Sequence, residues 1–132
     1  MTASGNKIFR TFFLWLPTIF YMTLIFYFSS LSKPVPYELP KHADKVIHIL
    51  EYAILGFLMS YSIRNSGANN FFSLGFLFSS FYGMTDEIHQ LFVFMRDASV
   101  VDVGADIIGS LVGVYCYRMI INRRMRWRIL PQ

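Results

Sequence analysis

The first long apolar run of the chain, residues 11–32, reads TFFLWLPTIFYMTLIFYFSSLS and contains no charged residue. At about 1.5 Å per residue, a helix of this length crosses a hydrocarbon core about 30 Å thick. The run is too long for the apolar core of a secretory signal peptide, and no cleavage site of small residues follows it. It therefore predicts a permanent transmembrane helix over residues 12–31.

The composition of the whole chain also indicates a membrane protein. Of its 132 residues, 55% are hydrophobic and only 15% are charged, whereas a soluble domain carries about 25% charged residues. The net charge of +4 does not indicate a nucleic-acid partner, because the arginines crowd the C-terminal end beyond an apolar stretch. That arrangement is typical of the cytoplasmic flank of a membrane helix. The single cysteine, Cys116, excludes an internal disulfide and most simply packs as a small apolar side chain.

Three further apolar runs follow a proline-rich loop that cannot continue the first helix. A short polar turn separates the first two of these runs, and a tight connection separates the last two. The expected helices after the first cover residues 43–63, 71–92 and 100–121. The fold class is therefore an all-α integral membrane protein, a single domain over residues 1–132 built as a bundle of four transmembrane helices.

The basic residues predict the orientation of this bundle in the plasma membrane. If both termini are cytoplasmic, eight of the twelve Lys and Arg residues lie inside, as the positive-inside rule requires. The four on the outside are Lys33, Lys41, Lys45 and Arg96. All eight acidic residues then fall in or near the outer leaflet, so we expect an acidic outer face.

Polar residues recur at helical spacing near the predicted outer ends of three helices. The second helix begins with Asp44, Lys45, His48, Glu51 and Tyr52, and the third ends with Asp86, Glu87, His89 and Gln90. The fourth begins with Ser99, Asp102 and Asp106, followed on the same face by Gly109 and Gly113. In the third helix, spacings of three and four place Asp86, His89 and Gln90 on one face, with Glu87 rotated away. From the helical rise, these residues lie within about 12 Å of the outer boundary.

The simplest interpretation of this convergence is a hydrogen-bonded knot that joins three helices. Arg96 and Lys45 could each neutralise an aspartate, and the two glycines could let helices approach closely. The balance of charge argues against a purely structural role, because five carboxylates (Glu51, Asp86, Glu87, Asp102 and Asp106) face only two cations. Burying that excess is costly unless a proton, a metal ion or a cationic ligand enters.

The spacing of these polar residues resembles that of the VanZ-like family over about residues 28–115. The residues that carry the resemblance are Asp44, Lys45, His48, Glu51, Tyr52, Asp86, Glu87, His89, Gln90, Phe92, Arg96, Ser99, Asp102, Asp106, Gly109 and Gly113. The resemblance implies a bacterial-type multi-pass membrane protein of the cell envelope, associated with resistance to the glycopeptide teicoplanin. The chain departs from the family pattern just before Arg96, where Val93-Phe94-Met95 replaces the usual glycine or proline turn.

The first functional hypothesis is an outward-facing acidic and histidine-containing pocket. It would bind a lipid head group, a cationic moiety or a glycopeptide-like ligand and so modulate the envelope or confer glycopeptide resistance. The candidate binding residues are Asp44, Lys45, His48, Tyr52, Asp86, His89, Gln90, Arg96, Ser99, Asp102 and Asp106. Membrane lipid is the expected partner, and no nucleic acid is expected.

The second hypothesis is a metal-assisted hydrolase or phosphotransferase that acts on an envelope lipid or a lipid-linked phosphate. A divalent ion would be held by His48, His89, Asp102 and Asp106. Glu51 or Glu87 would serve as general base, and Arg96 would clamp a phosphate. A third hypothesis, proton-coupled transport, follows from the carboxylate and histidine chain, but it needs a homo-oligomer to form a pathway.

Overall fold

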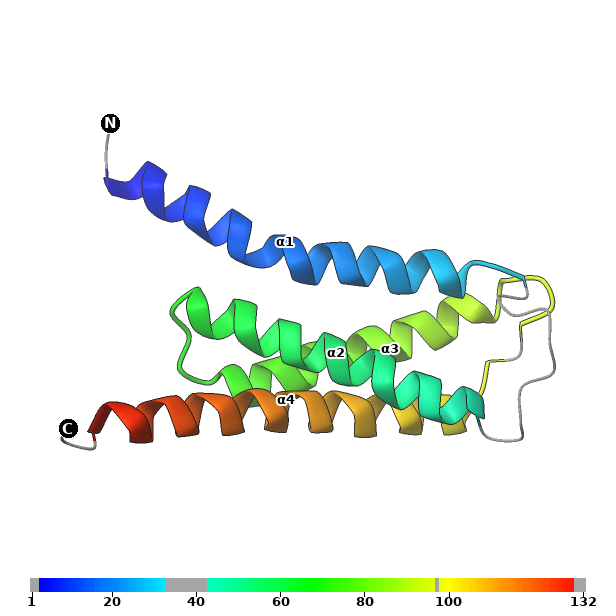
Figure 1. The fold of residues 1–132 in the computed structure, drawn as a ribbon. Coiled ribbons are helices and arrows are strands. Elements are labelled where there is room, and N and C mark those ends of the chain that lie inside the picture. Colours follow the sequence, from blue (N-terminus) through cyan, green and yellow to red (C-terminus); the bar gives the residue numbers. More distant parts are fainter. Residues whose placement is uncertain (1–2, 33–42, 97, 130–132) are drawn as a thin grey trace.

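The computed structural model describes residues 3–32, 43–96 and 98–129. In these ranges the chain forms four helices and no strand (Figure 1). The helices are α1 (Ala3–Ser29), α2 (Ala43–Asn65), α3 (Phe71–Gln90) and α4 (Val100–Ile129). The all-α class predicted from the sequence is therefore confirmed for the described residues. The proline-rich loop, with Lys33 and Lys41, lies outside them.

The bounds of the first and last helices, α1 and α4, differ most from the sequence prediction. Helix α1 begins at Ala3 rather than at residue 12, and α4 ends at Ile129 rather than at residue 121. The prediction was wrong because an apolar run marks only the part of a helix that suits lipid. Lys, Arg and Met are good helix formers, so the helix continues into its charged flanks.

Three of the four helices are long and apolar enough to cross a membrane. The candidate spans are Lys7–Ser29, Ala43–Asn65 and Val100–Arg126. Helix α3 is not among them, because its last two turns contain Asp86, Glu87, His89 and Gln90. The chain is therefore a helical membrane protein, and the fourth span stays a prediction.

Helix α2 occupies the centre of the arrangement and contacts each of the other three helices. Helices α2, α3 and α4 all contact one another, whereas α1 contacts only α2 and α3. Figure 1 shows α1 lying along one side of this three-helix unit, with its N-terminal half diverging from α2. The described chain is thus a three-helix unit with a fourth helix attached to one side.

Glycines bring the backbones of α2 and α4 into contact. A Cβ atom added at Gly109 would meet the carbonyl oxygen of Ile49, and one at Gly113 would meet that of Ala53. From the other helix, Gly56 faces the backbone of Ser110 in the same way. Close approach of this kind is what small residues four positions apart allow in membrane helices. The Gly109 and Gly113 stripe therefore serves helix packing.

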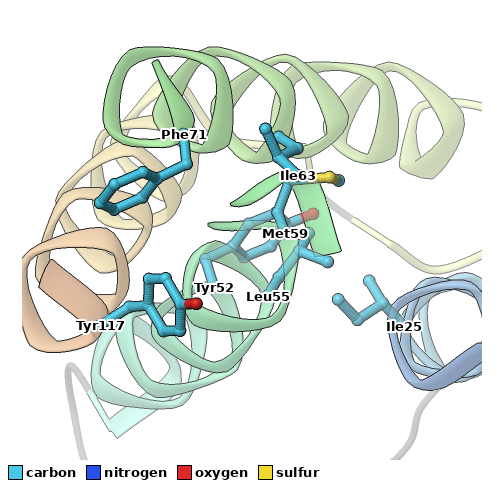
Figure 2. Close-up of a cluster of buried hydrophobic side chains, with 7 residues drawn as sticks. All are labelled: Ile25, Tyr52, Leu55, Met59, Ile63, Phe71 and Tyr117. Atoms are coloured by element: carbon cyan, nitrogen blue, oxygen red, sulfur yellow. The ribbon is translucent and has the colours of Figure 1, made fainter. Parts of the chain in front are cut away.

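A cluster of buried hydrophobic side chains joins all four helices (Figure 2). Its members are Ile25, Tyr52, Leu55, Met59, Ile63, Phe71 and Tyr117. The rings of Phe71 and Tyr117 meet edge to face with centroids 5.6 Å apart, which links the start of α3 to α4.

Candidate functional site

Four helix termini meet at one end of the molecule, opposite the beginning of α1 and the end of α4 (Figure 1). They are the C-terminal ends of α1 and α3 and the N-terminal ends of α2 and α4. The polar residues singled out in the sequence belong to these termini. The polar end of the bundle is therefore where a functional site has to be sought.

Two ion-pair contacts connect α2 to α4 at this end. Lys45 Nζ pairs with Asp102 Oδ1, and it also lies 2.9 Å from Asp44 Oδ2. One turn further along, His48 Nδ1 and Asp106 Oδ1 share a hydrogen bond of 2.8 Å, and the Asp106 side chain is fully buried. Each of the two α4 aspartates, Asp102 and Asp106, therefore contacts a basic side chain of α2.

The end of α3 is held to the beginning of α4 through Glu87. Glu87 Oε2 accepts a 3.0 Å hydrogen bond from the backbone N–H of Ser99. Gln90 Nε2 donates to Asp86 Oδ2 at 2.9 Å and to Glu87 Oε1 at 3.3 Å, so the two carboxylates share one amide. Glu87 is therefore buried beside Asp86, whereas its spacing had indicated that it turned away. The tertiary contact with α4, which periodicity within α3 does not reveal, explains this difference.

Two predicted site residues face α1 instead of the α2–α4 pairs. His89 Nε2 and Ser30 Oγ share a hydrogen bond of 3.1 Å, and the His89 ring lies against Phe26 with centroids 4.5 Å apart. Arg96 donates from Nε to the carbonyl oxygen of Leu31 at 3.1 Å and from Nη2 to that of Phe28 at 2.8 Å. Arg96 therefore caps the C-terminal end of α1, and it pairs with none of the aspartates that the structure describes.

The turn that carries Arg96 to α1 has an unusual backbone. Met95 adopts φ 61°, in the left-handed region that favours glycine. This is the segment where the VanZ-like pattern usually has a glycine or proline, so a methionine here costs about 1–2 kcal/mol. The two hydrogen bonds from Arg96 to α1 help to offset that cost.

Substitution of Arg96 by alanine should loosen the C-terminal end of α1. Two charge-assisted hydrogen bonds to backbone carbonyls are lost, each worth about 1.5–3 kcal/mol. We expect faster hydrogen exchange at the amides of Ser30 and Leu31, which close the last turn of α1. Lysine at position 96 should not restore protection, since its single ammonium does not match the two-pronged contact. Unchanged exchange in both variants would contradict this role for Arg96.

One group of described residues could hold a metal ion. It consists of His48, Glu87 and Asp102, whose ligand atoms all lie within 4.8 Å of one another. This set differs from the predicted one, because His89 faces α1 and Asp106 holds the Nδ1 atom of His48. An outer carboxylate on a ligating histidine is a common arrangement in metal sites. However, the ammonium of Lys45 already neutralises Asp102.

A cavity of about 360 Å³ lies between α1, α2 and α3 at the polar end. Its lining residues are Ile25, Phe28, Ser29, Asp44, Ile47, His48, Glu51, Asp86, Gln90 and Arg96. Two of these are only 5% exposed and yet have a polar atom without a hydrogen-bond partner, Asp86 Oδ1 and Ser29 Oγ. Less than 1 Å² of each atom is accessible, so both atoms lie behind the surface of the cavity.

Tyr52, another predicted binding residue, lies on the interior of the bundle rather than in the cavity wall. Its side chain is fully buried, and its hydroxyl has no partner among the described residues. A Cβ atom at Gly83 would lie 3.1 Å from Tyr52 Cε1 and 2.8 Å from Asp106 Cβ, so Gly83 lets these two side chains pack against α3. Tyr52 therefore belongs to the packing behind the polar residues.

Sequence reasoning missed the contribution of α1 to the site. Ile25, Phe28 and Ser29 line the cavity, although the first apolar run had indicated only a transmembrane helix. The one available signal was the pair Ser29-Ser30 at the end of an otherwise apolar run. These two serines lie at the same end of the bundle as the polar residues of the other helices.

The fold and the cavity together define a small helical membrane protein with an acidic cavity at one end of its bundle. A family model described as VanZ/LLP1 matches residues 6–122. The chain therefore belongs to the VanZ/LLP1 family, and the match includes nearly all of α1 as well as the polar residues of the other helices. Neither a curated protein nor a solved structure matches the chain.

Proposed function

We propose that the protein spans the plasma membrane four times, with both termini in the cytoplasm and the acidic cavity near the outer surface. The beginning of α1, the α2–α3 turn and the end of α4 lie at the same end of the bundle (Figure 1). Lys7, Arg10, Arg64 and the arginines of the last turns of α4 belong to that end, which suits a cytoplasmic face. Topology reporters fused to the two termini test this orientation.

The function that the site supports best is binding of a cationic group by the acidic cavity. The observation that carries this proposal is a pair of carboxylates in the cavity lining, Asp86 and Glu51, for which the described residues provide no ion-pair partner. Asp44 also lines the cavity, but Lys45 pairs with it. A positively charged group with N–H donors would neutralise Asp86 and Glu51.

Lys45 and Arg96, the described Lys and Arg side chains at this end of the bundle, already have other partners. Lys45 pairs with Asp44 and Asp102, and Arg96 donates to the backbone of α1. Glu51 and Asp86 therefore have no ion-pair partner within the described residues. An unpaired excess of carboxylates inside a membrane protein favours a functional role over a structural one.

Family membership and the cavity together favour a role in the cell envelope, including resistance to glycopeptides such as teicoplanin. We expect the Asp86→Asn variant to lose most of this resistance, because the amide keeps the contact with Gln90 but removes the charge. The measurement is the teicoplanin concentration that inhibits growth of a susceptible bacterial host expressing each variant. Thr85→Ala, at an exposed neighbouring position, is the matched control. Full resistance with Asp86→Asn at an equal membrane level would contradict the proposal.

Metal-assisted hydrolysis of an envelope lipid or lipid-linked phosphate is the second candidate, and the group His48, Glu87 and Asp102 favours it. A divalent ion held there would polarise a phosphate or activate a water molecule. We rank it below cation binding, since Lys45 occupies the cationic position at Asp102. Elemental analysis of the purified protein, combined with turnover assays on lipid phosphates, separates the two candidates.

A further inference from the structure

The last turns of α4 extend beyond the rest of the bundle. Figure 1 shows the end of α4 projecting past the α2–α3 turn. From the helical rise, Arg123 and Arg126 lie about 35 and 39 Å along the axis from Val100. The hydrocarbon core of a bilayer is about 30 Å thick, and the head groups bring the total to about 40–45 Å. A helix α4 that crosses the membrane therefore carries these two arginines to the level of the lipid head groups.

A surface cavity of about 430 Å³ lies against this end of α4. The described residues that line it are Met119, Asn122, Arg123, Met125 and Arg126. Spacings of three and four place the two arginines and the asparagine on the same helical face as Met119. This surface cavity therefore combines two guanidinium groups and an amide with the side chains of two methionines.

The positive charge of the surface cavity has no nearby carboxylate to balance it. Arg123 and Arg126 are exposed, and neither has an ion-pair partner among the described residues. No Asp or Glu occurs in residues 52–85 or after residue 106, so the acidic residues of α2, α3 and α4 lie at the opposite end of the bundle. A complementary anion is therefore one that a partner supplies.

An exposed apolar strip leads along α4 to the two arginines. Its members are separated by four, three and four positions and so share one helical face, and all of them are exposed: Ile108, Val112, Tyr115 and Met119. Helix α1 does not cover this strip, because it contacts only α2 and α3. One face of α4 therefore changes from an apolar surface at membrane depth to a cationic surface at the head groups.

We infer that this face of α4 binds an anionic phospholipid. The phosphate lies in the surface cavity, where Arg123, Arg126 and the amide of Asn122 donate hydrogen bonds to its oxygens, and an acyl chain lies along the apolar strip. The planar fork of an arginine matches two phosphate oxygens, and arginine clusters next to a membrane helix attract anionic head groups. This inference concerns the end of the bundle opposite the acidic cavity and does not depend on the cation-binding function.

The net charge of the head group follows from the same arginines. In phosphatidylcholine the phosphate is accompanied by a quaternary ammonium, which two neighbouring guanidinium groups repel. Phosphatidylglycerol has a phosphate of the same kind beside an uncharged polyol, whose hydroxyls can also accept hydrogen bonds from Asn122. We therefore expect the surface cavity to select the anionic lipid over the zwitterionic one.

The test compares these two lipids with identical acyl chains by native mass spectrometry of the full-length protein released from detergent. We expect phosphatidylglycerol to bind about tenfold more tightly, the value of one charge-assisted hydrogen bond. Arg123→Gln should remove most of this preference. Arg124→Gln is the matched control, because Arg124 is also exposed but is turned by about 100° around the helix and does not line the surface cavity. The control should keep the preference.

Two outcomes of this comparison would overturn the inference. Equal binding of the two lipids to the unaltered protein would show that the head-group charge is not recognised. An equal loss in Arg123→Gln and Arg124→Gln would show attraction to the overall charge of the helix end instead of a site.

A second arm separates the lipid from a soluble phosphate. An excess of glycerol phosphate of about tenfold over phosphatidylglycerol should leave the bound lipid in place, because glycerol phosphate has no acyl chain to contact the apolar strip. Displacement of the lipid would mean that the phosphate alone is recognised, and it would overturn the assignment to a phospholipid.

Discussion

Replacing Gly113 by leucine is expected to prevent the protein from reaching its folded state in the membrane. A Cβ atom at this position would overlap the carbonyl oxygen of Ala53 and lie 2.8 Å from the backbone nitrogen of Phe57. Because both obstacles are backbone atoms, no side-chain rotation relieves the overlap, and α2 and α4 have to separate. We expect a loss at or above the upper end of the range of about 1–3 kcal/mol for overpacking.

The loss is measured as the melting temperature and the folded fraction of the purified protein in detergent. Gly104→Leu is the matched control, because it makes the same change in the same helix at a position with nothing within 4 Å of the added Cβ atom. The control should retain the fold. A Gly113→Leu protein as stable as the control would show that α2 and α4 do not pack through this glycine.

Removal of His48 should destabilise the polar end of the bundle strongly. The His48→Ala variant removes from Asp106, which is fully buried, the one side-chain partner that it has among the described residues, since no partner for Asp106 Oδ2 is found there. Breaking one side of a buried pair costs about 3–5 kcal/mol, because the remaining charge is neither paired nor hydrated. We expect a loss of this size in the unfolding free energy in detergent.

The double variant His48→Ala with Asp106→Asn distinguishes a lost charge pair from a lost side chain. Removing the remaining carboxylate charge should recover a large part of the stability, as expected when both partners of a buried pair are neutralised. It should not recover ligand binding, because His48 also lines the cavity. A double variant that is no more stable than His48→Ala would mean that the histidine acts through packing alone.

Much of the fold could be predicted from periodicity and charge, because the length and the polar face of each helix follow from the residues of that helix alone. The four apolar runs became four helices, and Asp102 and Asp106, one turn apart, both face α2. The bounds of α1 and α4 were less predictable, since charged helix formers such as Lys7 and Arg123 continue a helix beyond the apolar run.

The partners of individual side chains were much harder to predict. Arg96 was expected to neutralise a carboxylate or to hold a phosphate, but it binds two carbonyl oxygens of α1. His89 was grouped with His48, but it also faces α1. Both residues are close in sequence to the acidic cluster, and only the position of α1 decides which way they turn.

The sequence by itself determined that the protein is helical, that it belongs in lipid, and that carboxylates and histidines gather at one end. These properties follow from hydropathy and from the helical repeat, which act within a single segment. The tertiary structure alone decided that Lys45 and His48 pair with α4, that Glu87 holds the backbone of Ser99, and that α1 supplies a wall of the cavity. Pairing depends on how each helix is rotated against its neighbours, and here that rotation is set by backbone contacts at Gly56, Gly109 and Gly113.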